Sequence, residues 1–138
     1  MATFTKLEDM QIWVKARMIA KKVYDLTNDE VFNKDFSLRN QMRSAAVSIV
    51  SNIAEGYERE THKEFIRFLY ISKGSAGELK TQIIIATDCE YFSEQNSQTI
   101  IEELTELAAQ ISRLISYLKK QLNHNREKET RNQQPANK

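Results

Sequence analysis

Residues able to perform acid–base, nucleophilic or metal chemistry are few and scattered along the chain. His62 and His124 are the only histidines, and Cys89 is the only cysteine. Neither histidine has a metal-ligand spacing to the other or to Cys89, so the sequence predicts no metal site. Glu55 and Glu58 form a carboxylate pair, but acids at a helix end are commonly solvated, and no phosphate-cradling loop or nucleophile elbow is present. We therefore expect a protein without catalytic activity and without a cofactor.

A stripe of mostly small polar residues follows one face of a helix predicted over residues 37–55. Buried polar groups must find partners. We expect Asn52 and Glu55 to hydrogen-bond the next helix, or the loop after Gly56, which stands where helices often end in a left-handed cap. A buried asparagine can also fix helix register and oligomeric state. The expected structural network comprises Ser48, Asn52, Glu55, Gly56, Ser75 and Glu78. The alternative is that the same stripe forms a recognition surface.

Basic residues on the first two predicted helices give a candidate nucleic-acid-binding patch. The set is Lys15, Arg17, Lys21, Lys22, Arg39 and Arg43. The symmetry of an oligomer would multiply such a patch into a ring of positive charge. The alternative is a solvated face paired with Asp and Glu, because the whole chain has 20 basic against 19 acidic residues and a net charge of only +1.

Apolar residues recur at three- and four-residue steps along most of the chain, which contains only three glycines and one proline. This pattern predicts four helices, at about residues 7–26, 37–55, 62–92 and 97–123. Four long helices joined by short loops most simply form an antiparallel up-down-up-down four-helix bundle. We therefore expect an all-α fold with one domain over residues 1–123. Residues 124–138 lack apolar periodicity, which predicts a disordered polar tail.

Each predicted helix has a line of mostly apolar residues that we expect to face the core. In chain order these are Trp13, Ala16, Ala20, Val23 and Tyr24; Leu38, Met42, Ala45, Ile49 and Ile53; Phe65, Leu69, Ser72, Ala76, Leu79, Ile83 and Ala86; and Ile101, Leu104, Ala108, Ile111, Ile115, Leu118 and Leu122. The first and third helices carry further apolar faces, which favour burial in a homo-oligomer. Gly74 and Gly77 fall in mid-helix, which predicts the close approach of a neighbouring backbone.

Cellular location follows from two features of the sequence. The first ten residues, MATFTKLEDM, lack the apolar stretch of a signal peptide. The longest apolar runs are far shorter than the roughly 18 residues needed to cross a bilayer. We therefore expect a cytoplasmic protein with no membrane partner.

One long segment resembles a known protein family. Trp13 and Ala16, together with QMRSAAVSIVSNIAEGYERETHKEFIRFLYISKGSAGEL over residues 41–79, closely resemble the four-helix-bundle family of 23S rRNA intervening-sequence proteins. The most specific elements are Gln41, Arg43, Ala45, Ser48, the block from Asn52 to Gly56, Arg59, Phe65, Gly74, Ser75, Glu78 and Leu79. The resemblance spans roughly residues 7–118 and implies a bacterial origin and a bundle fold.

The resemblance also implies partners. The family is similar to the accessory variability determinant proteins of diversity-generating retroelements, which are homopentamers that bind nucleic acid and a reverse transcriptase. It thus implies a homopentamer, with structured RNA or a nucleic-acid enzyme as partner. The predicted function is an RNA-binding accessory or scaffold protein. A structural or protein-interaction module that does not bind nucleic acid is the alternative.

Overall fold

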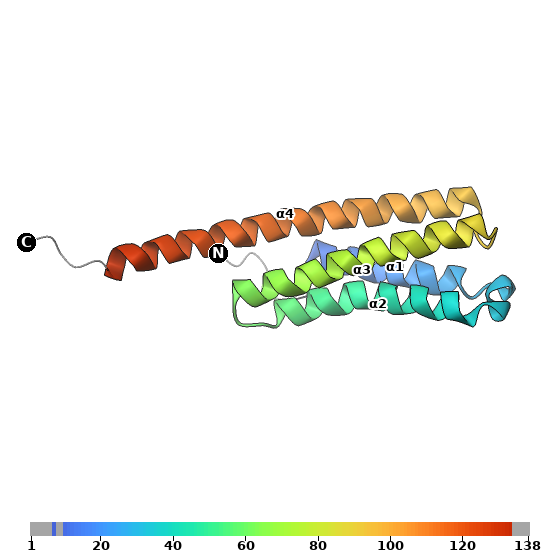
Figure 1. The fold of residues 1–138 in the computed structure, drawn as a ribbon, viewed down its shortest axis with the longest axis horizontal. Helices are drawn as coiled ribbons and strands as arrows, with labels where there is room; N and C mark the ends of the chain where they lie inside the picture. Colours follow the sequence, from blue (N-terminus) through green and yellow to red (C-terminus); the bar gives the residue numbers. More distant parts are fainter. Residues whose placement is uncertain (1–6, 8–9, 134–138) are drawn as a thin grey trace, which may run out of the picture.

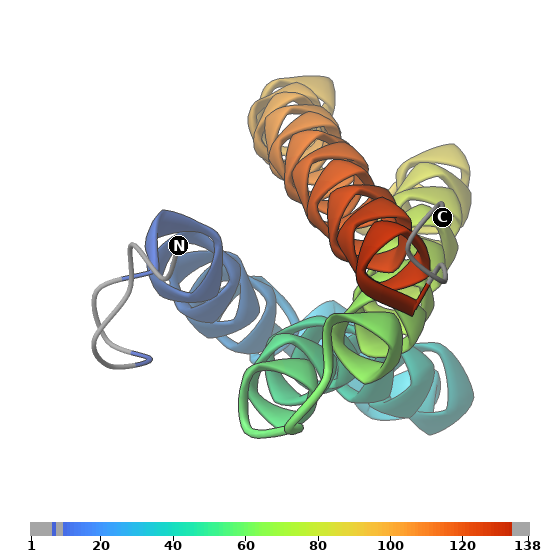
Figure 2. The ribbon, with the colours of Figure 1, turned by 90° about the vertical axis from the view of Figure 1, so that its left-hand side faces the viewer.

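A computed structural model of the chain describes residue 7 and residues 10–133. Within them, α1 (Gln11–Leu26), α2 (Phe36–Tyr57), α3 (His62–Asp88) and α4 (Glu94–Gln133) are α-helices, and η2 (Glu30–Lys34) is a short 3-10 helix. These described residues contain no strand, so the predicted all-α class is confirmed. The helices lie lengthwise beside one another, and successive connections fall at alternate ends of the molecule (Figure 1). Seen end-on, α1 and α4 flank the pair formed by α2 and α3 (Figure 2).

The core-facing side of α1 differs from the prediction. Its buried residues are Ile12, Ala16, Ile19 and Val23, a line at four- and three-residue steps that is rotated from the predicted one. Tyr24, which we expected in the core, is 42% exposed. Trp13 is only half-buried at the edge of the core. The cause is that α1 is apolar around most of its circumference, so periodicity alone does not choose which face turns inward.

The other three helices use the predicted faces. The line from Met42 to Ile53 on α2 and the line from Leu69 to Ala86 on α3 are buried, and Leu38 and Phe65 pack against the core at their ends. On α4, Leu104, Ile111, Ile115 and Leu118 are buried as expected. Together these side chains form one continuous core along the molecule.

The first connection has more structure than a loop. Asp29 accepts a hydrogen bond from the backbone N–H of Val31 at 3.2 Å, and Asp35 caps α2 by accepting one from Leu38 at 3.1 Å. Aspartate is among the residues preferred at such capping positions, because its short side chain can accept from a free backbone N–H. Between them, η2 buries Phe32 completely. The sequence did not predict this burial, because two adjacent apolar residues, Val31 and Phe32, in a polar segment have no periodicity to show which of them is buried.

The end of α3 lies four residues earlier than predicted. Glu90 adopts a left-handed backbone with φ of 61°, and the N–H of Tyr91 then donates to the carbonyl of Ala86 at 2.8 Å. This turn folds the chain back, so that the rings of Tyr91 and Phe92 pack on Phe32 with centroids 5.1 and 5.3 Å apart. The resulting aromatic cluster covers this end of the bundle.

The fourth helix begins three residues earlier and ends ten residues later than predicted. It runs to Gln133 and projects well beyond the ends of α2 and α3 (Figure 1). The expectation of a disordered tail is therefore wrong for residues 124–133, which are helical and exposed. The rest of that predicted tail, residues 134–138, lies outside the described part of the chain. The four-helix domain therefore carries a helical extension: α4 continues past Leu122, the last residue of its predicted apolar line, to Gln133.

The glycines behave differently from one another and from the prediction. Gly56 lies inside α2, which continues to Tyr57, and no glycine among the described residues has a positive φ. Its predicted role as a left-handed cap is therefore wrong. A Cβ at Gly56 would lie 2.9 Å from Phe68 Cβ, so this residue sets the close approach of α2 and α3. A Cβ at Gly74 or Gly77 would meet nothing within 4 Å, so the neighbouring backbone expected there is absent from the described chain.

Candidate nucleic-acid interface

The predicted polar network exists in part, at the contact between α2 and α3. The hydroxyls of Ser48 and Ser75 lie 2.8 Å apart and join the two helices. The amide of Asn52 donates to the Ser48 carbonyl at 2.8 Å and to the Ser48 hydroxyl at 3.0 Å. Asn52 therefore reaches α3 only through Ser48. A second link, which the sequence did not predict, is the buried hydroxyl of Ser72, which donates to the Ile49 carbonyl at 2.8 Å.

The two glutamates assigned to this network have other surroundings. Glu55 is exposed and forms an ion pair with Arg59, 2.6 Å away, in the segment after Gly56. This contact agrees with the second partner expected for Glu55, the loop after Gly56. Glu78 is also exposed, and no hydrogen bond in the described residues joins it to Asn52 or Glu55. The network therefore ends at the serine pair and positions α2 against α3.

Five of the six predicted basic residues interact with their own chain. Lys21 pairs with Asp25 at 2.7 Å, and Lys22 pairs with Glu103 on α4. The three arginines stack on neighbouring aromatic rings, with distances to the ring centroids of 4.8 Å for Arg17 on Trp13, 4.5 Å for Arg39 on Phe36 and 4.6 Å for Arg43 on Tyr24. Arg43 also donates to the Thr27 hydroxyl at 2.9 Å. These contacts favour the alternative given for these residues, a solvated face with internal partners, over a free cationic patch that binds nucleic acid.

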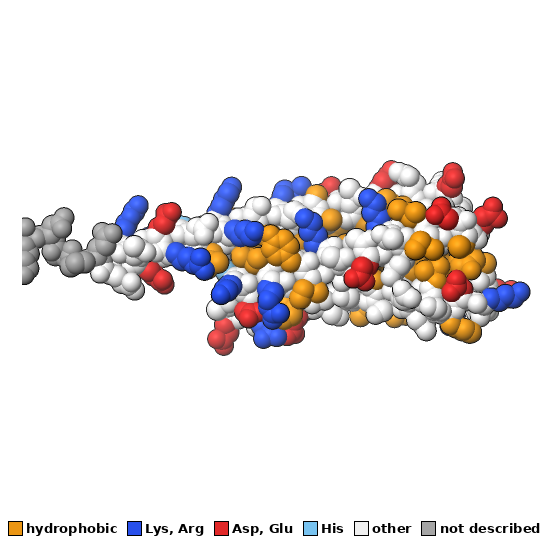
Figure 3. Space-filling model, in the orientation of Figure 1, with side chains coloured by type: hydrophobic (Ala, Val, Ile, Leu, Met, Phe, Trp, Pro, Cys, Tyr) orange, Lys and Arg blue, Asp and Glu red, His pale blue; other side chains and the backbone are white. Residues whose placement is uncertain are grey.

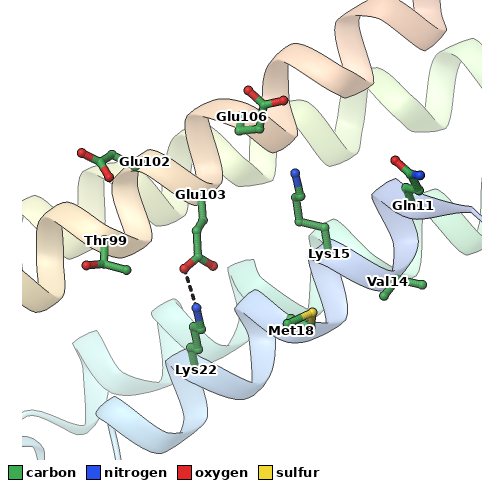
Figure 4. Close-up of a pocket in the computed structure, with 9 residues that line it drawn as sticks. All are labelled: Gln11, Val14, Lys15, Met18, Lys22, Thr99, Glu102, Glu103 and Glu106. Atoms are coloured by element: carbon green, nitrogen blue, oxygen red, sulfur yellow. Dashed lines mark hydrogen bonds and ion pairs between the residues drawn. The ribbon is translucent and has the colours of Figure 1, made fainter.

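The remaining predicted residue, Lys15, lies in a groove between α1 and α4 with a volume of about 750 Å³ (Figure 4). Val14 and Met18 line the groove from α1, and Met18 is 58% exposed. The opposite side carries three carboxylates from α4, those of Glu102, Glu103 and Glu106. A polyanion would be repelled by this wall, so the groove is a poor site for nucleic acid.

Charge is strongly segregated along α4. Residues 94–112 contain four acidic and no basic side chains, whereas residues 113–133 contain six basic and two acidic ones. The six are Arg113, Lys119, Lys120, Arg126, Lys128 and Arg131. On the face shown in Figure 3, Lys and Arg predominate toward the end from which α4 projects, and Asp and Glu predominate toward the other end. The separation of acidic and basic residues along α4 can be read from the sequence, but the net charge of the whole chain does not reveal it.

The first half of α3 adds positive charge beside the basic half of α4. Lys63, Arg67 and Lys73 are exposed there. The two helices meet where the ammonium of Lys119 donates to the Tyr70 hydroxyl at 2.7 Å. Arg67 pairs with Glu64 at 3.0 Å, but within the described residues no ion pair joins Lys63, Lys73 or Lys119 to an acid. We call this α3–α4 region the basic surface. It comprises Lys63, Arg67, Tyr70, Lys73, Arg113, Lys119, Lys120 and Arg126.

Other kinds of site find no support in the described residues. No group of three His, Cys, Asp or Glu side chains lies close enough there to hold a metal ion. Cys89 is exposed, and His124 lies on the projecting part of α4. None of the helices, over the described residues, has a stretch long and apolar enough to span a membrane.

Comparison with known proteins decides the family. The family model described as 23S rRNA-intervening sequence protein matches residues 8–113, which is more than half of the chain. The chain belongs to this family. The matched segment covers α1, α2, α3 and the acidic half of α4. Five of the six basic residues in the second half of α4 lie beyond it, so the basic surface combines a family segment with a following segment of this chain.

A solved structure supports the same fold. A protein of unknown function from the S23 ribosomal protein family of Bacteroides thetaiotaomicron is similar to this chain, with a TM-score of 0.70 and 22% identity. The similarity covers 75% of this chain and 97% of that one. At this level of identity, the similarity concerns the fold alone. No curated protein matches the chain.

Proposed function

We propose that this protein is a non-enzymatic, homo-oligomeric four-helix bundle that binds structured RNA as an accessory or scaffold protein in the bacterial cytoplasm. The proposed topology is antiparallel up-down-up-down, as expected for long helices joined by short connections. The observation that carries the proposal is the basic surface, where α3 and the second half of α4 place cations together with few acids. The resemblance to accessory variability determinant proteins adds a nucleic-acid enzyme as a further proposed partner.

The electrostatics of the basic surface suit a polyanion better than those of the predicted patch on α1 and α2. Phosphate contacts by Lys and Arg release counterions, which supplies most of the sequence-independent affinity for nucleic acid. Lys73 and Lys120 are exposed and have no acidic partner among the described residues. The projecting part of α4 extends the positive charge beyond the bundle (Figure 1). In an oligomer, several copies of this surface would act on one RNA and raise its affinity through avidity.

Self-association is proposed from the apolar side chains that the single chain leaves exposed. On α3 these are Ile84 and Ile85, 43% and 45% exposed, and α1 adds Val14 and Met18. A folded monomer rarely exposes large contiguous apolar patches. Five copies is the number that the family resemblance implies. A purely structural or protein-binding role is the second candidate, and the same exposed side chains favour it.

The experiment is an RNA-binding measurement on nuclease-treated protein, with its mass determined by light scattering on the same preparation. The RNA is a structured rRNA fragment, labelled for fluorescence anisotropy. The test variant carries Lys119→Glu with Lys120→Glu, on the basic surface. Its matched control carries Lys21→Glu with Lys34→Glu, which makes the same change in net charge at the acidic end of the molecule.

The proposal predicts that the test variant binds RNA at least tenfold more weakly than the control, with the oligomeric mass unchanged. Equal losses in both variants would mean that net charge alone governs binding and would reject the basic surface. A well-assembled oligomer that does not bind RNA even at low salt would leave the protein-interaction role as the function.

A further inference from the structure

The basic surface contains an aromatic ring in an unusual setting. Tyr70 is 47% exposed on α3. Its hydroxyl accepts a hydrogen bond from the Lys119 ammonium at 2.7 Å, and that nitrogen lies 5.1 Å from the ring centroid. A cation so close to the hydroxyl and so far from the centroid lies off the hydroxyl end of the ring. It therefore holds the hydroxyl end of the ring and does not itself cover either face.

The chain around Tyr70 also leaves the ring uncovered. Helical side chains lean toward the N-terminus, so the residue one turn later normally covers the one before it. At Tyr70 that later residue is Gly74, and Gly77 follows after one more turn. Both glycines face open space, since a Cβ at either would have no heavy atom within 4 Å. They cost α3 about 1 kcal/mol each relative to alanine. The surface of α3 one and two turns beyond Tyr70 therefore carries no side chain.

The other tyrosines for which contacts are described are occupied. The ring of Tyr24 carries the guanidinium of Arg43, 4.6 Å from its centroid. Tyr57 packs edge to face against Phe65. Tyr91 packs on Phe32 and donates its hydroxyl to Asp35 at 3.1 Å. Tyr117 is also exposed and lies beside Arg113 and Lys120. What distinguishes Tyr70 is the hydrogen bond that Lys119 donates to its hydroxyl.

We propose that Tyr70 is a stacking platform for an unpaired base, and that the cations beside it bind the flanking phosphates. The inference rests on the proposed function and names its ligand class, which is single-stranded RNA such as a loop, a bulge or an end. An exposed aromatic ring accepts any base, whereas a duplex keeps its bases stacked inside. The neighbouring phosphates would lie within reach of three cations. Arg67 and Lys73 are three residues to either side of Tyr70 on α3, and Lys119 lies beside it on α4.

The test compares an unstructured RNA strand with the duplex formed by that strand and its complement. The variants are Tyr70→Leu, Tyr70→Phe and the matched control Tyr24→Leu, an exposed tyrosine of similar accessibility outside the basic surface. Losing one stacked base weakens binding roughly five- to 150-fold. We expect this loss for Tyr70→Leu with the single strand and no change with the duplex. Tyr70→Phe keeps the ring but loses the hydrogen bond from Lys119, so its loss with the single strand should be smaller than that of Tyr70→Leu. Tyr24→Leu should bind both RNAs as the wild type does.

A second readout reports stacking directly. The fluorescence of a 2-aminopurine in the single strand should be quenched by wild-type protein and by Tyr70→Phe, but not by Tyr70→Leu. Equal effects of Tyr70→Leu on strand and duplex, or no effect on either, would overturn the inference while leaving RNA binding intact. Failure of the wild type to bind either RNA would instead reject the proposed function together with the inference.

Discussion

Gly56→Ala tests how closely α2 and α3 must approach one another. A Cβ at this position would lie 2.9 Å from Phe65 Cδ1, 2.9 Å from Phe68 Cβ and 3.2 Å from the Phe65 carbonyl oxygen. The Phe65 ring can rotate away, but the Phe68 Cβ and the carbonyl oxygen are fixed to the backbone of α3. The two helices would therefore have to separate.

Two terms of opposite sign set the size of the effect. Overfilling a packed contact costs about 1–3 kcal/mol, whereas replacing a glycine inside a helix by alanine gains about 1 kcal/mol. Since a rigid backbone is involved, we expect the upper part of the first range and a net loss of about 1–2 kcal/mol in the free energy of unfolding. Gly77→Ala is the matched control. It should gain up to about 1 kcal/mol, because nothing in the chain lies near its new methyl group.

The assay is urea unfolding followed by circular dichroism, with the slope against urea checked for constancy. Measurements over a wide range of protein concentration separate the contribution of assembly from that of the folded chain. The reasoning would be refuted if Gly56→Ala were as stable as Gly77→Ala. The close approach of α2 and α3 would then not depend on the missing side chain.

Three further predictions concern other parts of the bundle. Ser72→Ala should lower the free energy of unfolding by about 1 kcal/mol, measured in urea, because it removes the buried hydrogen bond to the Ile49 carbonyl. The hydrogen bond to Asp35 raises the pKa of Tyr91. The bond therefore stabilises the fold fully below the ordinary tyrosine pKa of about 10. This stabilisation is lost as the pH rises through the raised pKa of Tyr91. Tyr91→Phe should accordingly be less stable than wild type near neutral pH, and the difference should shrink in unfolding curves recorded above about pH 10. Truncation after Asn123 should leave thermal unfolding unchanged, because the removed part of α4 is exposed, and should weaken RNA binding by removing positive charge.

Periodicity predicted the helices and three of the four core lines because α2, α3 and α4 each have one face more apolar than the others. It was only partly right on α1, where Ala16 and Val23 are buried as predicted but Ile19 is buried and Tyr24 exposed, because several faces of that helix are apolar. It also missed Phe32, which owes its burial to contacts with the distant Tyr91 and Phe92. Such contacts come from tertiary structure and have no local signal.

The candidate site was predicted less well than the fold. The Ser48 and Ser75 contact was expected, because small polar residues on facing helices must find partners at close approach. The basic residues were chosen from α1 and α2 by type alone, and the structure surrounds most of them with aromatic rings or acids. The basic surface depends on which half of α4 lies beside which half of α3. That pairing follows from the arrangement of the helices rather than from either segment alone.

The most direct test of RNA binding by the basic surface is the dependence of affinity on salt. For a duplex region, the slope of log affinity against log salt concentration changes by about 0.9 for each phosphate contact. The Lys119→Glu and Lys120→Glu double variant should therefore show a slope shallower than wild type by about 2, whereas the Lys21→Glu and Lys34→Glu control should keep the wild-type slope. Identical slopes for the wild type and the Lys119 and Lys120 variant would contradict the account.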